Sequence, residues 1–461
     1  MADATTPQAS ALDQPQFWTL DRIADALGLG PRGITPISRI STDTRTVVAG
    51  SCFVALKGES FDAHDFLAAA VASGAAAVVV NDARRGARLG VPVYEVADTL
   101  TALGALARYR RRVWGRPVVG VVGTNGKTST KELLRAALGG ALSVHATVGN
   151  YNNLVGVPLT LFALPDDADI AVIEMGTNQP GEVAALRAIV EPDVVVVTSI
   201  AEEHLEGLGD LAGVLREEVS ACSGVPLAVV PSAQPEIGDA ARPLAKRTIS
   251  VGLDAGDLHP TAWGIEADGQ GWLDLEGTRI RVPLRGVHNL RNAMLAVAVA
   301  RESGVSLDAV ARGIAAMPTP PMRVHFETHG SVTLINDAYN SNPGSARVAL
   351  ELLEHAGGAR QRVAVLGTML ELGVHADRLH DEVARAALDS PIELVVGVGG
   401  FADALMRVAP GDARVAGGAD PAAAWDAVRS RLAPDAVILL KGSRGVRLER
   451  LVPMISEWAN G

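Results

Sequence analysis

Short apolar runs alternate with helical patterns through the middle of the chain. The runs, rich in valine and isoleucine, lie at 118–122, 170–173, 194–197 and 227–230. Helical spacing separates them, as at 128–138 and 181–189. Strands that are apolar at every position are buried on both faces, so the pattern predicts a parallel sheet with helices on both sides. Alternating strands across 263–284, with glycine turns at 268–269 and 276–277, predict a small antiparallel addition.

Two further blocks flank this sheet. The first, 17–113, has helical patterns at 20–27 and 66–73 and extended segments at 37–42, 51–56 and 77–80. The other follows the proline-rich segment 318–321, and its apolar strands at 332–335, 363–366, 394–398 and 437–440 are typical of a Rossmann-like, doubly wound sheet. We therefore expect an α/β protein with three domains, 17–113, 114–318 and 319–461, after a flexible tail at 1–16.

Composition narrows the class of protein. Of the 461 residues, 48% are hydrophobic and 20% charged, which is enough apolar material for several cores. The net charge is −11 without a basic cluster, which argues against a general nucleic-acid binder. The N-terminus lacks the features of a secretory signal, and no apolar run approaches the roughly 20 residues of a membrane helix, so we expect a cytoplasmic protein. The two cysteines, Cys52 and Cys222, are expected to be buried thiols.

The strongest chemical motif follows the predicted strand 118–122 and opens the next helix. It consists of Gly123, Thr124, Asn125, Gly126, Lys127, Thr128 and Ser129. In this context backbone N–H groups cradle the phosphates of a nucleotide, Lys127 reaches the β- and γ-phosphates, and Thr128 ligates Mg²⁺. The spacing departs from the common P-loop, because Val121 stands where a glycine is usual. Glu174 ends a neighbouring parallel strand, where a carboxylate is placed to hold the same Mg²⁺.

This variant of the phosphate loop resembles that of the Mur ligases, which build the bacterial cell-wall precursor, and of the related folylpolyglutamate synthases. The resemblance implies that His204 ligates a second Mg²⁺ and that Asn292 contacts the adenine of ATP. By itself, an asparagine early in a helix is usually a cap. The resemblance also implies that Arg323 approaches the γ-phosphate and that Asp337 binds the ribose.

The stretch 336–345, Asn-Asp-Ala-Tyr-Asn-Ser-Asn-Pro-Gly-Ser, selects one branch of this family. It resembles the Mur ligases that add D-alanyl-D-alanine to UDP-N-acetylmuramoyl-tripeptide, as do 41–45, 53–66, 149–158 and 441–445. The resemblance implies a monomeric enzyme that uses ATP and Mg²⁺, makes an acyl phosphate and holds the UDP-sugar in its first domain. The catalytic residues that it implies are Lys127, Glu174, His204 and Arg323. The substrate-binding residues that it implies are Ser41, Asp43, Thr44, Arg45, Lys57, Asp62, His64, Asn150, Asn152, Asn153, Tyr339, Asn340, Asn342, Lys441, Ser443 and Arg444.

Three other functions share a phosphate loop or a nucleotide-sugar site. One is a ligase of the same superfamily that adds the third peptide residue or extends folate, and the stretch 336–345 argues against it. Another is a P-loop switch or kinase that makes no amide. The third is a module that only binds a UDP-sugar, and the set of Lys127, Glu174 and His204 argues against that.

Two positions depart from the family pattern. Thr368 stands where the family usually has aspartate. Most Mur ligases also carry a carbamoylated, metal-binding lysine about fourteen residues after the histidine, and this chain has Glu218 there. We expect Glu218 to supply the metal-binding carboxylate directly. The alternative is that Glu217 and Glu218 belong to a solvated helix face.

Overall fold

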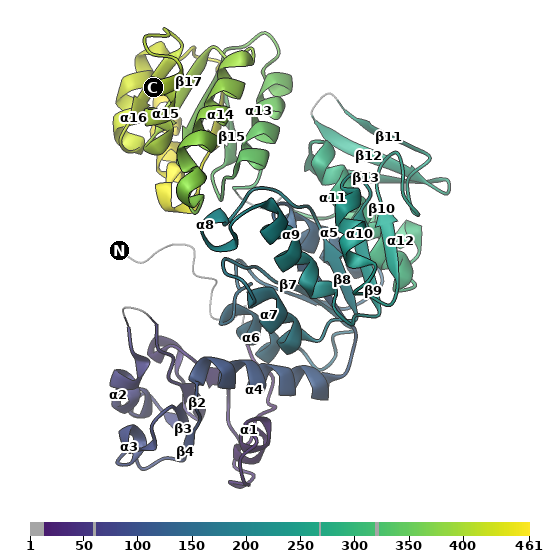
Figure 1. The fold of residues 1–461 in the computed structure, drawn as a ribbon, viewed down its shortest axis with the longest axis vertical. Helices are drawn as coiled ribbons and strands as arrows, with labels where there is room; N and C mark the ends of the chain where they lie inside the picture. Colours follow the sequence, from purple (N-terminus) through teal and green to yellow (C-terminus); the bar gives the residue numbers. More distant parts are fainter. Residues whose placement is uncertain (1–12, 59–60, 267–268, 319–321) are drawn as a thin grey trace.

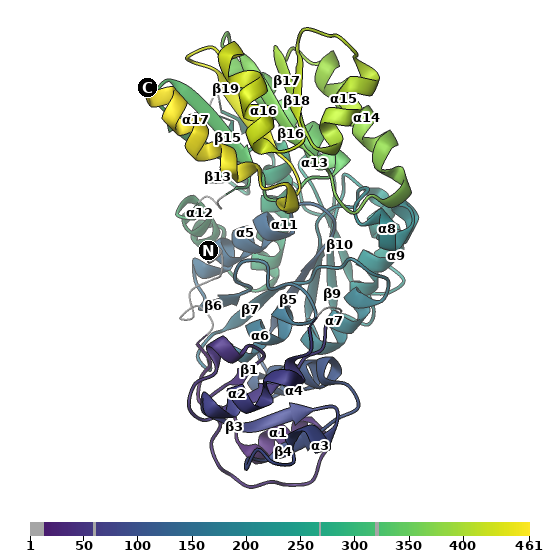
Figure 2. The same ribbon diagram turned by 90° about the vertical axis from the view of Figure 1, so that its left-hand side faces the viewer.

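A computed structural model describes residues 13–58, 61–266, 269–318 and 322–461. Within these residues the chain forms three α/β units stacked along the longest axis of the molecule (Figures 1 and 2). The expected flexible tail at 1–16 falls mostly outside the described residues. Gln14, near its end, exchanges two side-chain hydrogen bonds of 2.9 Å with the backbone of Ile40.

The N-terminal unit is a four-stranded parallel sheet in the order β1-β2-β3-β4. Its strands are β1 (Ile40–Ser41), β2 (Ser51–Val54), β3 (Ala75–Val80) and β4 (Val93–Glu95). Its helices are α1 (Leu20–Ala26), α2 (Leu67–Ala72) and α3 (Ala83–Gly86). The elements predicted for this block occur with shifted ends, and every residue of β2 is buried, as its apolar pattern predicts.

Helix α4 (Thr99–Trp114) connects the N-terminal and central units (Figure 1). Arg110 and Arg111 are buried in this helix and pair with Asp166 and Asp193 of the central unit at 2.6 and 2.9 Å. The domain boundary expected at 113–114 therefore lies at the end of a helix that already packs on the central unit.

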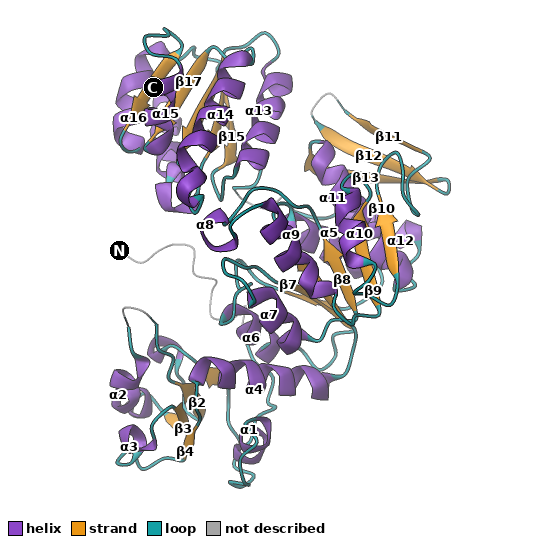
Figure 3. Ribbon diagram, in the orientation of Figure 1, coloured by secondary structure: helices purple, strands orange, loops and turns teal. Residues whose placement is uncertain are grey.

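The central unit is built on a six-stranded parallel sheet in the order β10-β9-β8-β5-β7-β6. Its strands are β5 (Val118–Val122), β6 (Val144–Ala146), β7 (Ile170–Glu174), β8 (Val194–Val197), β9 (Leu227–Pro231) and β10 (Thr248–Val251). Its helices are α5 (Lys127–Gly139), α6 (Gly156–Phe162), α7 (Glu182–Val190), α8 (Leu205–Leu208), α9 (Leu211–Val219), α10 (Pro235–Ala241), α11 (Val287–Glu302) and α12 (Leu307–Ala315). Helices cover both faces of the sheet, as the continuous apolar strands predict (Figure 3).

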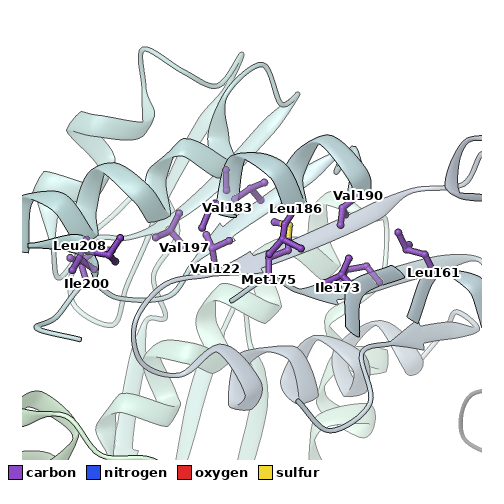
Figure 4. Close-up of a cluster of buried hydrophobic side chains, with 14 of the residues drawn as sticks. Val122, Leu161, Ile173, Met175, Val183, Leu186, Val190, Val197, Ile200 and Leu208 are labelled. Atoms are coloured by element: carbon purple, nitrogen blue, oxygen red, sulfur yellow. The ribbon is translucent and has the colours of Figure 1, made fainter. Parts of the chain in front are cut away.

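The buried core of the central unit packs beneath the edge of the sheet where the loops after β5, β7 and β8 begin. Figure 4 shows Val122, Ile173 and Val197, from three neighbouring strands, beside Val183 and Leu186 of α7. All five side chains are fully buried. Because close packing of this kind resists displacement, the loops after β5, β7 and β8 start from a rigid base.

A three-stranded antiparallel sheet extends the central unit. It consists of β11 (Ala262–Ile265), β12 (Gln270–Leu275) and β13 (Thr278–Arg285). Glu276 and Gly277 connect β12 and β13 with φ values of 49° and 84°. Two positive values are typical of the two-residue hairpin turn predicted at this point. Position 268 of the other predicted turn lies outside the described residues.

The C-terminal unit is a six-stranded sheet in the order β14-β15-β19-β16-β17-β18, in which β14 alone of the described strands is antiparallel to its neighbour. Its strands are β14 (His325–His329), β15 (Val332–Asp337), β16 (Arg362–Gly367), β17 (Leu394–Val398), β18 (Val415–Gly418) and β19 (Val437–Lys441). Its helices are α13 (Pro343–Gly357), α14 (Ala376–Asp389), α15 (Gly400–Val408), α16 (Pro421–Val428) and α17 (Leu451–Asn460). Across the described residues, no helix has the length and apolar character needed to cross a membrane.

Candidate active site

The phosphate loop runs from β5 into α5 through two glycines in the left-handed region. Gly123 has a φ of 118° and Gly126 a φ of 85°, which side chains other than glycine rarely adopt. A Cβ on Gly123 would lie 2.4 Å from Thr198 Oγ1, and one on Gly126 would lie 2.9 Å from Asn292 Nδ2. The shape of the loop therefore requires both glycines. Asn292 is buried inside α11 and packs against the loop, so it is not a helix cap.

Lys127 begins α5 and turns its ammonium group back toward the loop. Its Nζ donates to the carbonyl oxygens of Gly123 at 2.5 Å and Thr124 at 3.1 Å. A phosphate bound at the N-terminus of α5 would offer the ammonium group a charged acceptor. Charged acceptors form stronger hydrogen bonds than carbonyl oxygens do, so the exchange favours phosphate binding.

Thr128 and Glu174 provide oxygen atoms that fit Mg²⁺. Thr128 Oγ1 lies 3.2 and 3.1 Å from the two carboxylate oxygens of Glu174, and Asn152 donates to Glu174 Oε1 at 3.0 Å. Within the described parts of the chain, no three His, Cys, Asp or Glu side chains gather closely enough to hold a metal by themselves. A single carboxylate, Glu174, beside the hydroxyl of Thr128 suits Mg²⁺, because proteins usually bind this ion through one or two carboxylates together with substrate phosphates.

His204 follows β8 with a positive φ of 53° and connects the central unit to the C-terminal unit. Its Nδ1 is hydrogen-bonded to Glu371, and its Nε2 lies 3.9 Å from Glu203 Oε2. Burial disfavours the charged ring, but the two carboxylates outweigh this effect and raise the pKa of His204. The hydrogen bond from His204 in turn lowers the pKa of Glu371. With Nδ1 engaged, Nε2 is the ring atom available to a ligand.

Glu218 lies behind the phosphate loop. Its side chain is buried, and its Oε2 accepts a hydrogen bond from the backbone N–H of Gly123 at 2.8 Å. Burial raises the pKa of Glu218, and the charge of Lys127 and the bond from Gly123 oppose the rise. Direct ligation of a metal by Glu218 stays a prediction, and it would require the carboxylate to leave the loop. Glu217 is not simply solvated, because it accepts from two backbone N–H groups at the start of α7 at 2.8 Å each.

Asp337 and Lys441 form an almost buried ion pair at the ends of β15 and β19. The two charged groups are 2.7 Å apart, with side chains 13% and 5% exposed. Lys441 also donates to the carbonyl of Asn340 at 2.8 Å. His288 lies near this pair, and burial lowers the pKa of its ring to about 4, so the ring is neutral at pH 7. The expected ribose-binding acid therefore already has a cationic partner.

The phosphate loop contacts the C-terminal unit directly. Asn125 and Asn342 exchange side-chain amide hydrogen bonds of 3.2 and 2.8 Å. The guanidinium of Arg323 lies 4.2 Å from the centre of the Tyr339 ring, which holds it by a cation–π interaction. The two units are thus in contact around the loop that is expected to bind ATP.

A cavity of about 670 Å³ between the central and C-terminal units contains most of the expected site residues. Its volume is in the range of nucleotide and cofactor sites. The expected residues that line it are Thr124, Asn125, Gly126, Lys127, Thr128, Ser129, Asn150, Asn152, Asn153, Glu174, His204, Asn292, Arg323, Asp337, Tyr339, Asn340, Asn342 and Lys441. The expected residues that do not line it are Gly123, Glu218, Ser443, Arg444 and all those of the N-terminal unit.

Ser443, Arg444 and Thr368 connect loops within the C-terminal unit. Ser443 Oγ accepts from the N–H of Leu370 at 3.0 Å, and Arg444 pairs with Glu449 at 3.2 Å. Thr368 Oγ1 accepts from the N–H of Gly400 at 2.9 Å. The residue in place of the usual aspartate therefore joins the end of β16 to the strand-to-helix loop after β17.

The candidate substrate residues 41–45 of the N-terminal unit form a turn after β1. Asp43 caps this turn and binds Arg45 through both carboxylate oxygens, with a shortest distance of 2.6 Å. Ser41 Oγ is hydrogen-bonded to the Asp43 carbonyl at 3.0 Å, and Thr44 begins the turn. The side chain of Arg45 is 88% exposed, so it is accessible to a ligand.

The second group of candidate substrate residues, Lys57, Asp62 and His64, is held more tightly. Lys57 is exposed and pairs with Asp62 through an isolated β-bridge. The ring of His64 is fully buried, its Nδ1 lies 2.6 Å from Asp62 and its Nε2 accepts from the N–H of Asn81. A hydrogen bond from Arg85 is the main reason why the pKa of Asp62 is lowered. Direct contact between His64 and a substrate stays a prediction, since one of these bonds would have to break.

Two carboxylates next to His204 were not identified from the sequence. Glu203 lines the cavity directly before His204, and Glu371 holds His204 from the C-terminal unit. The only sequence signal was their position beside motif residues, which does not say where a side chain points.

Family profiles and relatives match almost the whole chain. The profile of the Mur ligase family catalytic domain matches 36–111, that of the Mur ligase middle domain 121–300, and that of the Mur ligase glutamate ligase domain 322–444. The UDP-N-acetylmuramoyl-tripeptide–D-alanyl-D-alanine ligase of Escherichia coli (strain K12) is 34% identical over 454 residues, which cover 95% of this chain and 98% of the relative. The chain belongs to the Mur ligase family. The enzyme of the same name from Bacillus subtilis (strain 168) is 33% identical over 92% of this chain and 94% of its own length.

Solved structures agree with this Mur ligase in fold. A crystal structure of MurF from Acinetobacter baumannii has a TM-score of 0.87 at 30% identity and covers 96% of this chain and 100% of the other. MurF from Thermotoga maritima, solved in complex with ADP, has a TM-score of 0.79 at 27% identity, over 91% and 97% of the two chains. The predicted α/β fold and the resemblance to the Mur ligases are thereby confirmed.

Proposed function

We propose that this Mur ligase joins D-alanyl-D-alanine to UDP-N-acetylmuramoyl-tripeptide with ATP, for cell-wall synthesis in the cytoplasm. The observation that carries the proposal is the cavity in which the phosphate loop faces the stretch 336–345. Relatives with this activity in their names match 92–95% of the chain at 33–34% identity. A folylpolyglutamate synthase from Yersinia pestis is 20% identical with a TM-score of 0.58, which supports a shared fold and not a shared substrate.

The reaction has two bond-forming steps, and neither needs a protein nucleophile. A carboxylate oxygen of the tripeptide attacks the γ-phosphorus of ATP, which gives an acyl phosphate and ADP. The amine of the dipeptide then attacks the acyl carbon, inorganic phosphate leaves, and the amine loses a proton. The protein therefore contributes by positioning the reactants and by stabilising the negative charge that develops on the transferred phosphoryl group.

Five residues that line the cavity support this proposal. Lys127 and the loop N–H groups would bind the β- and γ-phosphates, and Arg323 would reach the γ-phosphate from the C-terminal unit. Thr128 and Glu174 would hold Mg²⁺, with His204 as the expected ligand of a second ion. Mg²⁺ bound there would neutralise phosphate charge. The exposed turn at 41–45 and Lys57 would bind the UDP-sugar on the N-terminal unit.

Product analysis tests this proposal. The enzyme is incubated with ATP, Mg²⁺, D-alanyl-D-alanine and a UDP-N-acetylmuramoyl-tripeptide whose third residue is diaminopimelate or lysine. We expect a product in mass spectrometry that equals the sum of the two substrates less one water, and phosphate release that needs both. Phosphate release without either substrate would indicate a P-loop switch or kinase. A product from a UDP-linked dipeptide with a single amino acid would indicate a ligase for the third residue.

A further inference from the structure

Four carboxylates line the cavity in the described part of the chain: Glu174, Glu182, Glu203 and Asp337. Glu174 binds Thr128 and Asn152, and Asp337 forms its ion pair with Lys441. Glu182 accepts from backbone N–H groups of the loop before α7. Glu174 thus belongs to the expected metal site, Asp337 to an ion pair and Glu182 to a loop. Among these four carboxylates, only Glu203 has no such role.

One buried oxygen of Glu203 has no hydrogen-bond partner in the part of the chain that the structure describes. Its side chain is only 9% exposed, and its Oε1 accepts from Asn340 Nδ2 at 2.9 Å. Its Oε2 is buried and has no hydrogen-bond partner among the described residues, and His204 Nε2, at 3.9 Å, is too distant to be one. A buried carboxylate oxygen without a donor is costly, so this position calls for a cationic or hydrogen-bonding ligand.

The incoming substrate of the proposed reaction supplies such a ligand. The amino group of a dipeptide has a pKa of about 8 and is largely an ammonium ion at pH 7, with three N–H donors. It must approach the acyl phosphate near Lys127, and Glu203 lines the same cavity. Asn340, which fixes the other carboxylate oxygen, belongs to the C-terminal unit, so contact between the units orients the carboxylate.

We propose that Glu203 is a substrate-positioning residue whose free carboxylate oxygen binds the ammonium group of the second substrate, a short peptide with a free N-terminus. This rests on the proposed ligase function. A divalent cation is the competing ligand, above all the second ion expected at His204, whose Nε2 lies 3.9 Å from the same oxygen. The first ion has its own oxygen ligands in Thr128 and Glu174, so only the second competes for Glu203, and the Mg²⁺ requirement of the variant decides between that ion and the amine. Glu203 would then select for a charged amine and hold its nitrogen near the acyl carbon. The ammonium gives one proton to the surrounding water, which frees its lone pair for attack, and the second proton leaves as the amide forms and phosphate departs.

The test compares Glu203→Gln with Glu202→Gln. Glu202 is the matched control, because it is the adjacent acid and pairs with Arg378 of the C-terminal unit at 3.5 Å. At saturating ATP and UDP-N-acetylmuramoyl-tripeptide, we expect Glu203→Gln to raise KM for D-alanyl-D-alanine roughly thirtyfold or more, which is typical for removal of one partner of a buried charge pair. The control should stay within about twofold of wild type.

Two further measurements separate amine binding from other roles. Acyl phosphate formed without the dipeptide, trapped by borohydride reduction, should be unchanged in Glu203→Gln. D-Lactyl-D-alanine, in which a hydroxyl replaces the ammonium, should inhibit wild type and variant equally. Glu203→Asp, which keeps the charge, should recover part of the lost affinity if Glu203→Gln folds poorly.

An unchanged KM for the dipeptide, a loss of acyl phosphate, or a raised Mg²⁺ requirement in Glu203→Gln would each overturn the inference. If wild-type enzyme gives no product with D-alanyl-D-alanine, the proposed function itself fails. The two failures are therefore distinguishable.

Discussion

Replacement of Glu218 by glutamine gives a direct test of how the phosphate loop is supported. Glu218 is buried, and its Oε2 accepts from the N–H of Gly123 at 2.8 Å. Glutamine has nearly the same shape, and its carbonyl oxygen can accept the same hydrogen bond, but it carries no charge. Any difference between wild type and Glu218→Gln that depends on pH therefore reports the cost of the charge.

The sign of this difference follows from the raised pKa. Burial lifts the pKa of Glu218 above its ordinary value of 4.5, so the folded protein binds the proton more tightly than the unfolded chain. The stability that this provides is complete below pH 4.5 and is lost as the pH rises through the folded pKa. Each pKa unit corresponds to about 1.4 kcal/mol. Glu218→Gln should thus gain stability relative to wild type as the pH rises toward 8.

Thermal unfolding of the nucleotide-free enzyme in EDTA, at several pH values from 5 to 8, measures the effect. For a unit of this size, about 1 kcal/mol shifts Tm by roughly 2 to 4 °C. Glu217→Gln is the matched control on the same helix. It should lose about 1 kcal/mol at every pH, because Glu217 caps the start of α7. Parallel wild-type and Glu218→Gln curves from pH 5 to 8 would refute the reasoning, since they would mean that burial does not penalise the charge.

Three further predictions concern ligand binding and turnover. Lys127→Ala should keep its fold, judged by Tm, while its rate of product formation falls roughly a thousandfold or more. Near-normal turnover would contradict the phosphate-loop assignment. Arg323→Ala should lose turnover far more than it loses affinity for ATP, which calorimetry measures. Tyr339→Phe is the control, because it keeps the aromatic ring that Arg323 packs on. A collapse of ATP affinity without loss of turnover would contradict the role of Arg323 at the γ-phosphate. Asp43→Asn and Arg45→Ala should weaken binding of the UDP-sugar substrate and leave ATP affinity unchanged, and equal loss of both ligands would exclude a separate UDP site.

The sequence was most informative where burial and backbone geometry dictate residue type. The runs at 118–122 and 194–197 became β5 and β8 with the predicted ends, because valine-rich runs suit strands that are buried on both faces. The phosphate loop could be identified because Gly123 and Gly126 adopt positive φ values that few other residues tolerate. Local chemistry of this kind needs no knowledge of distant contacts.

Contacts between units could not be predicted in the same way. Nothing near Glu371 in the chain indicates that it binds His204, 167 positions away. Glu217 and Glu218 are neighbours in the sequence but have different roles. Glu217 caps α7, whereas Glu218 supports the phosphate loop. Neighbouring residues on a helix point about 100° apart, and only the packing around the helix says what each of them meets.

The segment after β8 gives a physical reason for contact between the central and C-terminal units. Three consecutive side chains, Glu202, Glu203 and His204, each take a partner from the C-terminal unit, namely Arg378, Asn340 and Glu371. An acyl phosphate is hydrolysed if water reaches it before the amine does, so a ligase gains by assembling its amine site only when the units meet. Because Asn340 orients Glu203 and Glu371 orients His204, separation of the units would release both residues. The same contact that excludes water would then also create the place where the second substrate binds.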